Sequence, residues 1–229
     1  MGKIVAVGGG ELGLRETWEI DRYIASLSPN RYPKLLFIPT ASHDTESYIQ
    51  VVSEVYGEFG CRTEALCLES RQYTPHEIEG MILSSDIIYV GGGDTEYMMN
   101  KWHEYGVDSL LKKAWHRNIV LSGLSAGSDC WFIAGYADSE FLQGVENPKF
   151  KWIKGLGLLP FLHTPHYNDP ARRGFDDALK GQITDAVALD NNTAFVDIDG
   201  KYSVFRADLN MHAYYFRNDG TSSLRSVIE

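Results

Sequence analysis

Residues 119–127 read Ile-Val-Leu-Ser-Gly-Leu-Ser-Ala-Gly, an apolar run that leads without interruption into a serine flanked by two glycines. The apolar part has the length and composition of a buried strand. Gly-x-Ser-x-Gly between such a strand and a following helix is the pattern of a nucleophile elbow, a tight turn that lifts the serine hydroxyl out of the backbone. The stretch therefore predicts an α/β fold in which Ser125 stands just beyond the carboxyl end of a strand.

Short apolar runs of the same kind alternate with helical periodicity from residue 3 to about residue 127. The predicted strands are 3–8, 34–39, 62–67, 86–90 and 119–123. Apolar positions recur at i, i+3, i+4 and i+7 within 20–27 and 48–55, which predicts two amphipathic helices. The segment 94–117 is predicted to be helical with a break near Gly106, because glycine weakens a helix interior. Alternating strands and helices imply crossovers onto a mostly parallel sheet.

Beyond residue 127 the pattern changes to glycine-rich connections, a helical stretch near 170–183 and period-two runs. Asp199-Gly200 separates two of these runs and is typical of a two-residue hairpin turn. A second hairpin is predicted to close at 218–220. We therefore expect a three-layer sandwich of the α/β class. It has a mostly parallel central sheet, helices on both faces and antiparallel hairpins near the C-terminus, all in one domain over residues 1–229.

The composition excludes several classes of protein. The chain has 229 residues, 44% of them hydrophobic and 23% charged, which is typical of a globular protein rather than a disordered one. No apolar run approaches the roughly 20 residues of a membrane helix. A net charge of −10 disfavours a nucleic-acid partner. The N-terminal residues lack the features of a signal peptide, so cytoplasmic residence is expected. Three cysteines are too few for a disulfide framework and are interpreted as buried thiols.

Three glycine-rich loops follow predicted strands, at 8–10, 91–95 and 123–127. Ligands of open parallel sheets bind at this edge. In a nucleophile elbow the Ala126 N–H is a natural donor to an oxyanion, and the side-chain-free loop before Asp94 makes the Gly93 N–H a second candidate. The rival interpretation of the loop 91–93 is a phosphate cradle. The dinucleotide-binding pattern Gly8-x-Gly10-x-x-Gly13 fits the spacing, but Glu11 would sit where a pyrophosphate binds.

A serine nucleophile needs a base and a group that orients the base. His163 and His166 lie downstream of Ser125 after a short apolar segment and are the candidate bases. Spacing alone leaves three carboxylates open as the third group: Asp129, Asp138 and Glu140. The two histidines with Asp169 could instead form a metal site. Pro165 argues against both histidines facing one side of a helix, and we expect no metal.

Three motifs in this order resemble the dipeptidase E and cyanophycinase family of serine peptidases. They are Val-Gly-Gly-Gly-Asp-Thr at 90–95, Gly-Leu-Ser-Ala-Gly at 123–127 and Pro-His-Tyr at 165–167. The resemblance covers the chain from the first strand to about residue 185 and implies a glutamine-amidotransferase-like fold. It implies Ser125 as nucleophile, His166 rather than His163 as base, and the Gly93 and Ala126 amides as oxyanion hole. Glu140 aligns best with the family's triad acid, with Asp138 as the fallback.

The resemblance implies a serine exopeptidase that acts on short, aspartyl-containing peptides without a cofactor. Two alternatives stay open: a cyanophycinase-like hydrolase of β-aspartyl linkages, and a non-catalytic protein that binds a phosphate or nucleotide. Arg172, Arg173 and Lys180 follow His166 and are the nearby candidates to bind a substrate carboxylate. The expected partner is a small peptide, without nucleic acid or membrane, and the late exposed strands offer an edge for a homodimer.

Overall fold

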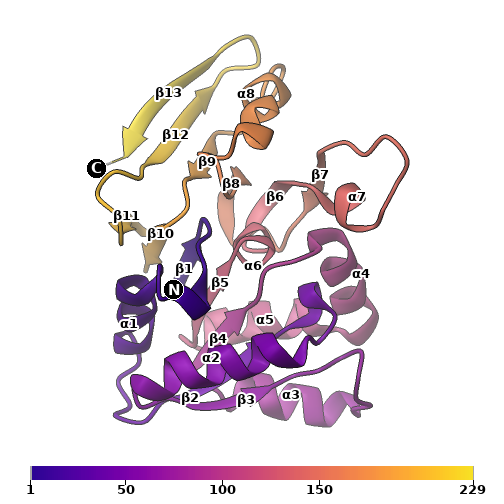
Figure 1. Cartoon of the computed structure of the whole chain (residues 1–229), viewed down its shortest axis with the longest axis vertical. Coiled ribbons are helices and arrows are strands. Elements are labelled where there is room, and N and C mark those ends of the chain that lie inside the picture. The colour runs from indigo at the N-terminus through magenta and orange to yellow at the C-terminus, as the bar shows by residue number, and fades with distance from the viewer. Residues whose placement is uncertain (1, 229) are drawn as a thin grey trace.

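The structure is a computed structural model that describes residues 2–228 and contains two β-sheets with helices around them (Figure 1). The first sheet has seven strands in the order β11-β10-β1-β5-β4-β2-β3. Five strands are parallel: β1 (Lys3–Val7), β5 (Val120–Leu124), β4 (Ile87–Val90), β2 (Lys34–Ile38) and β3 (Arg62–Ala65). Two antiparallel strands, β10 (Thr193–Ile198) and β11 (Lys201–Arg206), extend the sheet beyond β1. All five predicted parallel strands are confirmed to within two residues.

Helices cover both faces of this sheet, as predicted. The helices are α1 (Trp18–Ser26), α2 (Glu46–Glu58), α3 (Pro75–Leu83), α4 (Thr95–Tyr105), α5 (Val107–His116), α6 (Ala126–Asp129), α7 (Ser139–Leu142) and α8 (Gly174–Ala178). Three 3₁₀ turns are η1 (Leu12–Leu14), η2 (Thr40–Ser42) and η3 (Pro170–Arg173). Alternate strand residues such as Val5 and Ile4 belong to different clusters, one packed on α1 and α2 and the other on α3, α4 and α5. Burial on both faces explains why these strands are continuous apolar runs.

A second sheet of six strands in the order β13-β12-β9-β8-β6-β7 lies against the first. Its strands are β6 (Phe132–Ala137), β7 (Lys151–Lys154), β8 (Leu159–Thr164), β9 (Ala186–Leu189), β12 (Ala213–Asn218) and β13 (Ser223–Ile228). The sequence analysis expected glycine-rich connections beyond residue 127 and identified no strand over 132–157, where the structure has β6 and β7. Strands β6 and β7 in this region are short, and a glycine and lysines interrupt their apolar pattern. Their extended conformation depends on pairing with neighbouring strands and packing on the first sheet.

Short sequence motifs that require a particular backbone conformation predicted the helix break and the hairpin turn correctly. Gly106 separates α4 from α5 with a φ of 70°, the left-handed conformation that ends a helix at low cost in glycine. Asp199 and Gly200 have φ angles of 55° and 82° and connect β10 to β11, which confirms the hairpin. The helix expected over 170–183 is shorter and comprises η3 and α8. All three cysteines are buried free thiols, as predicted.

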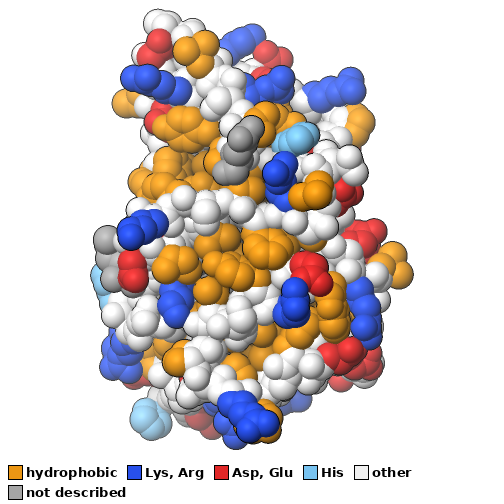
Figure 2. All heavy atoms as spheres, turned by 90° about the vertical axis from the view of Figure 1, so that its left-hand side faces the viewer, with side chains coloured by type: hydrophobic (Ala, Val, Ile, Leu, Met, Phe, Trp, Pro, Cys, Tyr) orange, Lys and Arg blue, Asp and Glu red, His pale blue; other side chains and the backbone are white. Residues whose placement is uncertain are grey.

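The edge strands β11 and β13 carry hydrophobic side chains at the surface. Tyr202, Leu224 and Val227 are among the exposed large hydrophobic residues. Figure 2 shows hydrophobic side chains between charged ones on this side of the molecule. These are the late strands for which a homodimer was considered, and that assembly stays a prediction. Among the helices of the described residues, none combines the length and the apolar character that crossing a membrane requires.

Candidate active site

Ser125 lies in the predicted strand–turn–helix, between β5 and α6. Its backbone has φ 58° and ψ −117°, a conformation that a residue with a side chain rarely adopts. The Ser125 N–H donates to Val7 O at 3.1 Å, which fixes the turn to the neighbouring strand β1. Such strain persists only where the surrounding structure imposes it. The elbow thus holds the serine hydroxyl at the carboxyl edge of the first sheet.

The two glycines of the elbow are required by close backbone contacts. A Cβ atom on Gly123 would lie 2.3 Å from Gly127 O, and one on Gly127 would lie 2.2 Å from Val90 O. Both atoms belong to the backbone of the sheet and the elbow, so neither can move aside cheaply. The glycines therefore permit α6 to start directly behind Ser125.

Replacing Gly123 by Ala is expected to lower the free energy of unfolding by about 1–3 kcal/mol, because the new methyl group overpacks a rigid contact. The matched control is Gly80→Ala in α3, where a Cβ meets nothing within 4 Å. That variant should gain roughly 0.5–1 kcal/mol from helix propensity. Chemical denaturation of both variants measures the difference. Equal stability of Gly123→Ala and the parent protein would contradict the packing argument.

His166 reaches Ser125 from the second sheet. It follows β8 in a loop, with a φ of 54°, and its N–H donates to Gly8 O at 2.9 Å. Its Nε2 lies 2.8 Å from Ser125 Oγ. Burial lowers the pKa of the imidazole below its usual 6.5, because the charged form loses hydration. The neutral ring can therefore accept the Ser125 proton at Nε2.

Asn191 occupies the position next to His166 where a triad acid was expected. Its Oδ1 lies 2.6 Å from His166 Nδ1, so the neutral ring donates its Nδ1–H to the amide oxygen. Asn191 follows β9, and its own N–H donates to Asn168 Oδ1 at 2.9 Å. The sequence analysis did not consider this residue. The sequence did contain a signal for it: Asp-Asn-Asn at 190–192 directly follows an apolar run, so polar side chains stand at the end of a strand.

The first glycine-rich loop makes room for this pair. A Cβ atom on Gly9 would lie 2.1 Å from Asn191 Oδ1 and 2.3 Å from His166 Nδ1. Gly9 O also accepts the Asn192 N–H at 2.9 Å. The loop 8–10 thus packs against His166 and Asn191, which gives Gly9 a structural reason other than a phosphate cradle.

Glu140 is not brought to His166. Its carboxylate accepts the Lys149 N–H at 2.9 Å and lies 3.4 Å from Lys151 Nζ, because α7 and the following loop turn it toward these lysines. The fallback, Asp138, pairs with Arg172 at 3.1 Å. Neither carboxylate has a hydrogen bond to His166 within residues 2–228. The contact that the resemblance implied for Glu140 is therefore replaced by Asn191.

The remaining candidates have structural contacts. His163 is fully buried, with Nε2 2.9 Å from Ser128 Oγ and Nδ1 2.8 Å from Val187 O, and burial lowers its pKa to about 3. Burial raises the pKa of Asp129 to about 7, and its Oδ2 accepts the Thr95 hydroxyl at 3.1 Å. His163 therefore does not converge with His166 and Asp169. Within 2–228, no group of three or more His, Cys, Asp or Glu side chains is placed to hold a metal ion.

Of the two predicted oxyanion donors, Ala126 is the first residue of α6, directly after Ser125, and Gly93 lies in the loop after β4. Gly92, which precedes Gly93, lies beside Ser125, because an added Cβ would be 3.2 Å from Ser125 Cβ. Gly93 has a φ of 135°, and an added Cβ would be 2.1 Å from Ala41 O. Among the described residues, neither the Gly93 nor the Ala126 N–H donates a hydrogen bond. Both amides therefore remain candidate donors to an oxyanion.

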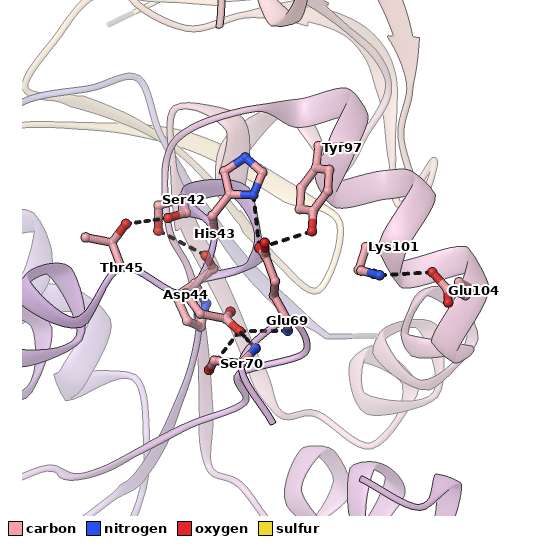
Figure 3. A network of polar contacts seen from close by, with 10 residues as sticks. Ser42, His43, Asp44, Thr45, Glu69, Ser70, Tyr97, Lys101 and Glu104 are labelled. Atoms are coloured by element: carbon pink, nitrogen blue, oxygen red, sulfur yellow. Dashed lines mark hydrogen bonds and ion pairs between the residues drawn. The ribbon is translucent and has the colours of Figure 1, made fainter. Parts of the chain in front are cut away.

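A polar network supports the loop that holds Gly93. Ala41 O accepts the Asp94 N–H at 2.8 Å, and the residues after Ala41 carry the network shown in Figure 3. His43 Nδ1 lies 2.9 Å from Glu69 Oε2, which also accepts the Tyr97 hydroxyl at 3.1 Å. In Figure 3 the His43 and Tyr97 side chains approach this carboxylate from two different elements. These contacts connect the loops after β2, β3 and β4.

A cleft of about 560 Å³ opens beside Ser125, a volume within the usual range of small-ligand sites. It is lined by residues of three regions: the segment 10–16, the start of α2, and the groups of the site itself. The lining residues are Gly10, Glu11, Leu12, Gly13, Glu16, Ser47, Tyr48, Val51, Gly92, Leu124, Ser125, His166 and Asn191. Ser125, His166 and Asn191 thus line one cavity that has the volume of a small-ligand site.

The chain is similar in sequence to known peptidases. Residues 4–205 match the profile described as Peptidase family S51. The chain is 33% identical over 169 residues to "Uncharacterized peptidase YgaJ" of Bacillus subtilis (strain 168), covering 73% of this chain and 70% of that protein. It is 26% identical over 186 residues to "Peptidase E" of Shewanella denitrificans, covering 75% and 74%.

Among solved structures, the fold is similar to a peptidase from an acI-B1 Actinobacterium. The TM-score is 0.73 at 19% identity, and the match covers 100% of this chain and 95% of that chain. At this identity the likeness concerns the fold alone. It extends to both sheets, because the whole chain is covered.

Proposed function

The chain belongs to peptidase family S51 and is a peptidase, and from this premise we propose that it hydrolyses short peptides through an acyl-enzyme on Ser125. The observation that carries the proposal is the 2.8 Å contact between His166 Nε2 and the hydroxyl of a strained elbow serine. A nucleophile and a base within hydrogen-bond distance, with the base itself oriented, are the signature of nucleophilic catalysis.

The geometry supports a two-step reaction. His166 Nε2 takes the proton as Ser125 Oγ attacks the peptide carbonyl carbon, and the Gly93 and Ala126 amides donate to the oxyanion that forms. The imidazolium then gives its proton to the leaving amine, so that the C–N bond breaks and an ester on Ser125 remains. Water deprotonated by His166 attacks this ester and restores the free serine.

Asn191 has a distinct part in this mechanism. By accepting the Nδ1–H, it holds the ring in the tautomer whose Nε2 faces Ser125. An asparagine fills the same position in papain-like proteases. Unlike a carboxylate, the amide carries no charge, so it orients the ring and stabilises the imidazolium by its dipole alone. Asn191 therefore takes the place that was expected for Glu140.

The pH profile tests the state of His166. The base works only when neutral, and burial lowers its pKa below 6.5. We therefore expect kcat/KM to be constant near neutral pH and to fall only as the pH decreases through this lowered value. Initial rates across the acid range, with far-UV circular dichroism to exclude unfolding, measure the midpoint. A midpoint above 6.5 would contradict a buried neutral base.

The first experiment is a panel of α-aspartyl, β-aspartyl and neutral dipeptides, with intact-mass analysis for an acyl-enzyme. Turnover with a transient ester on Ser125 is the expected result, and the preferred linkage distinguishes a dipeptidase from a cyanophycinase-like hydrolase. Covalent labelling by a serine-directed reagent is expected as well. A protein that turns over no peptide and forms no ester, but is stabilised by phosphates, would instead favour the binding hypothesis.

A further inference from the structure

The charges in the Ser125 cleft are all negative. Glu11 and Glu16 line it together with Ser125 and His166, and no lysine or arginine is among its lining residues. We infer that this cleft selects peptides that carry a positive charge next to the scissile bond, with Glu11 and Glu16 as the specificity-determining residues. The inference rests on the proposed peptidase reaction at Ser125, and it differs from the aspartyl preference that the resemblance implied.

The segment 11–16 contributes both glutamates to the lining of the cleft. Glu16 Oε2 accepts the Glu11 N–H at 2.9 Å, so the start and end of this segment are tied together. Within residues 2–228, neither carboxylate forms an ion pair. Their charges therefore remain available to a ligand.

The cation within this segment is directed away. Arg15 pairs with Glu58 of α2, and its guanidinium lies 4.6 Å from the ring centre of Trp18. Its φ of 62° ends η1 and turns the chain at this point. The local fold thus separates Arg15 from the two glutamates, although all three lie within six consecutive residues.

The cations that could have bound a substrate carboxylate have other partners. Arg172 is buried, pairs with Asp138 at 3.1 Å and donates from Nη1 to Tyr136 O at 2.8 Å. Lys180 pairs with Asp177 at 2.7 Å. Neither of these two, nor Arg173, lines the cleft. An aspartyl side chain entering the cleft would lose water without gaining a cationic partner, which costs free energy.

A cationic group, unlike an anionic one, would find partners of opposite charge in this cleft. An ammonium or guanidinium group in the cleft would face two carboxylates, and the net charge of −10 attracts such peptides over longer distances. Two groups supply this chemistry: the free α-amino terminus of a short peptide, and a lysine or arginine side chain. The experiment separates them.

The test uses dipeptides with lysine, norleucine, aspartate or asparagine at the first or second position, each with a free or an acetylated N-terminus. We expect a cationic peptide to exceed its neutral isostere roughly 3- to 10-fold in kcat/KM, as suits partly exposed ion pairs. Aspartate should not exceed asparagine. Loss of the advantage on acetylation assigns the charge to the α-amino group, and an advantage of lysine over norleucine assigns it to the side chain.

The variant Glu11→Gln/Glu16→Gln should bring the cationic-to-neutral ratio close to one, because glutamine keeps the shape and removes the charge. The matched control is Glu46→Gln/Glu54→Gln, which removes two exposed charges of α2 outside the cleft and should leave the ratio at its original value. A preference for aspartate over asparagine, or an unchanged ratio in the Glu11→Gln/Glu16→Gln variant, would overturn the inference.

Binding to Ser125→Ala, measured by calorimetry, separates this inference from the proposed function. The inactive variant cannot turn the peptides over, so its affinity reports charge preference alone. Equal affinities for the lysine and norleucine peptides, with free and acetylated termini alike, would overturn the inference even if the parent enzyme hydrolyses peptides. Tighter binding of the cationic peptides without any turnover by the parent enzyme would support it and contradict only the peptidase mechanism.

Discussion

Ser125→Ala is expected to reduce kcat for every hydrolysed peptide by roughly 10⁴- to 10⁶-fold, the range found when a nucleophile of this type is removed. The variant keeps His166, Asn191 and the oxyanion donors but cannot form the ester. A φ of 58° is similarly unfavourable for alanine and for serine, so the substitution should not destabilise the fold. Initial rates, thermal unfolding and intact mass after mixing with substrate measure the three properties.

The control for this variant is Ser53→Ala, an exposed serine of α2 outside the cleft. It removes the same hydroxyl group from the same protein without touching the site. We expect it to hydrolyse peptides at the parental rate. If Ser125→Ala retained more than about one per cent of the parental kcat while folded, Ser125 could not be the nucleophile, since loss of its covalent step should cost far more.

Asn191→Ala is expected to lower kcat roughly 10²-fold, because the imidazole loses its orienting acceptor and a small misplacement of a reacting group has an effect of this size. Glu140→Gln should change kcat less than about twofold, since its carboxylate bonds to Lys149 and Lys151 rather than to the base. Rates of the two variants under identical conditions decide which residue orients His166. A large loss in Glu140→Gln with a normal rate in Asn191→Ala would restore the triad implied by resemblance.

The variant Asn191→Asp tests the effect of placing a negative charge next to His166. A carboxylate beside Nδ1 favours the imidazolium, so the pKa of His166 should rise and the acid limb of the pH profile should move to higher pH. An unchanged midpoint would contradict the contact between residue 191 and His166 Nδ1. The loss of rate in Asn191→Ala, rather than this shift, tests whether the residue orients the ring.

The parts of the site that could be predicted from the sequence are those encoded within a few residues. The elbow around Ser125 needs only an apolar strand and two glycines with close backbone contacts. Gly106 and Asp199-Gly200 mark conformations that few other residues adopt, and they were placed correctly for that reason. The same local logic located Gly93 at the end of a strand.

The rest depends on contacts between distant segments. The strands of the second sheet are short and mixed in composition, so their pairing, rather than their own sequence, makes them regular. The sequence analysis did not consider Asn191 because it searched for titratable partners of the histidine, and an amide does not titrate. Nothing near Ser125 in the sequence points to this residue either. Glu140 was taken from the resemblance to the family's triad acid, whereas its contacts with Lys149 and Lys151 decide where its side chain lies.

The division of the site between two sheets has a consequence during synthesis. Ser125 follows β5 of the first sheet, whereas His166 and Asn191 follow β8 and β9 of the second. Strand β1 pairs with β5 on one edge and with β10 on the other, so its second edge stays unpaired until β10 has been synthesised. When the ribosome has added Ser125, His166 and Asn191 have not yet been synthesised, so the proposed nucleophile has no base. Under the proposed mechanism a growing chain cannot cut the nascent peptides around it, and hydrolysis begins only after Asn191 has emerged and both sheets have closed.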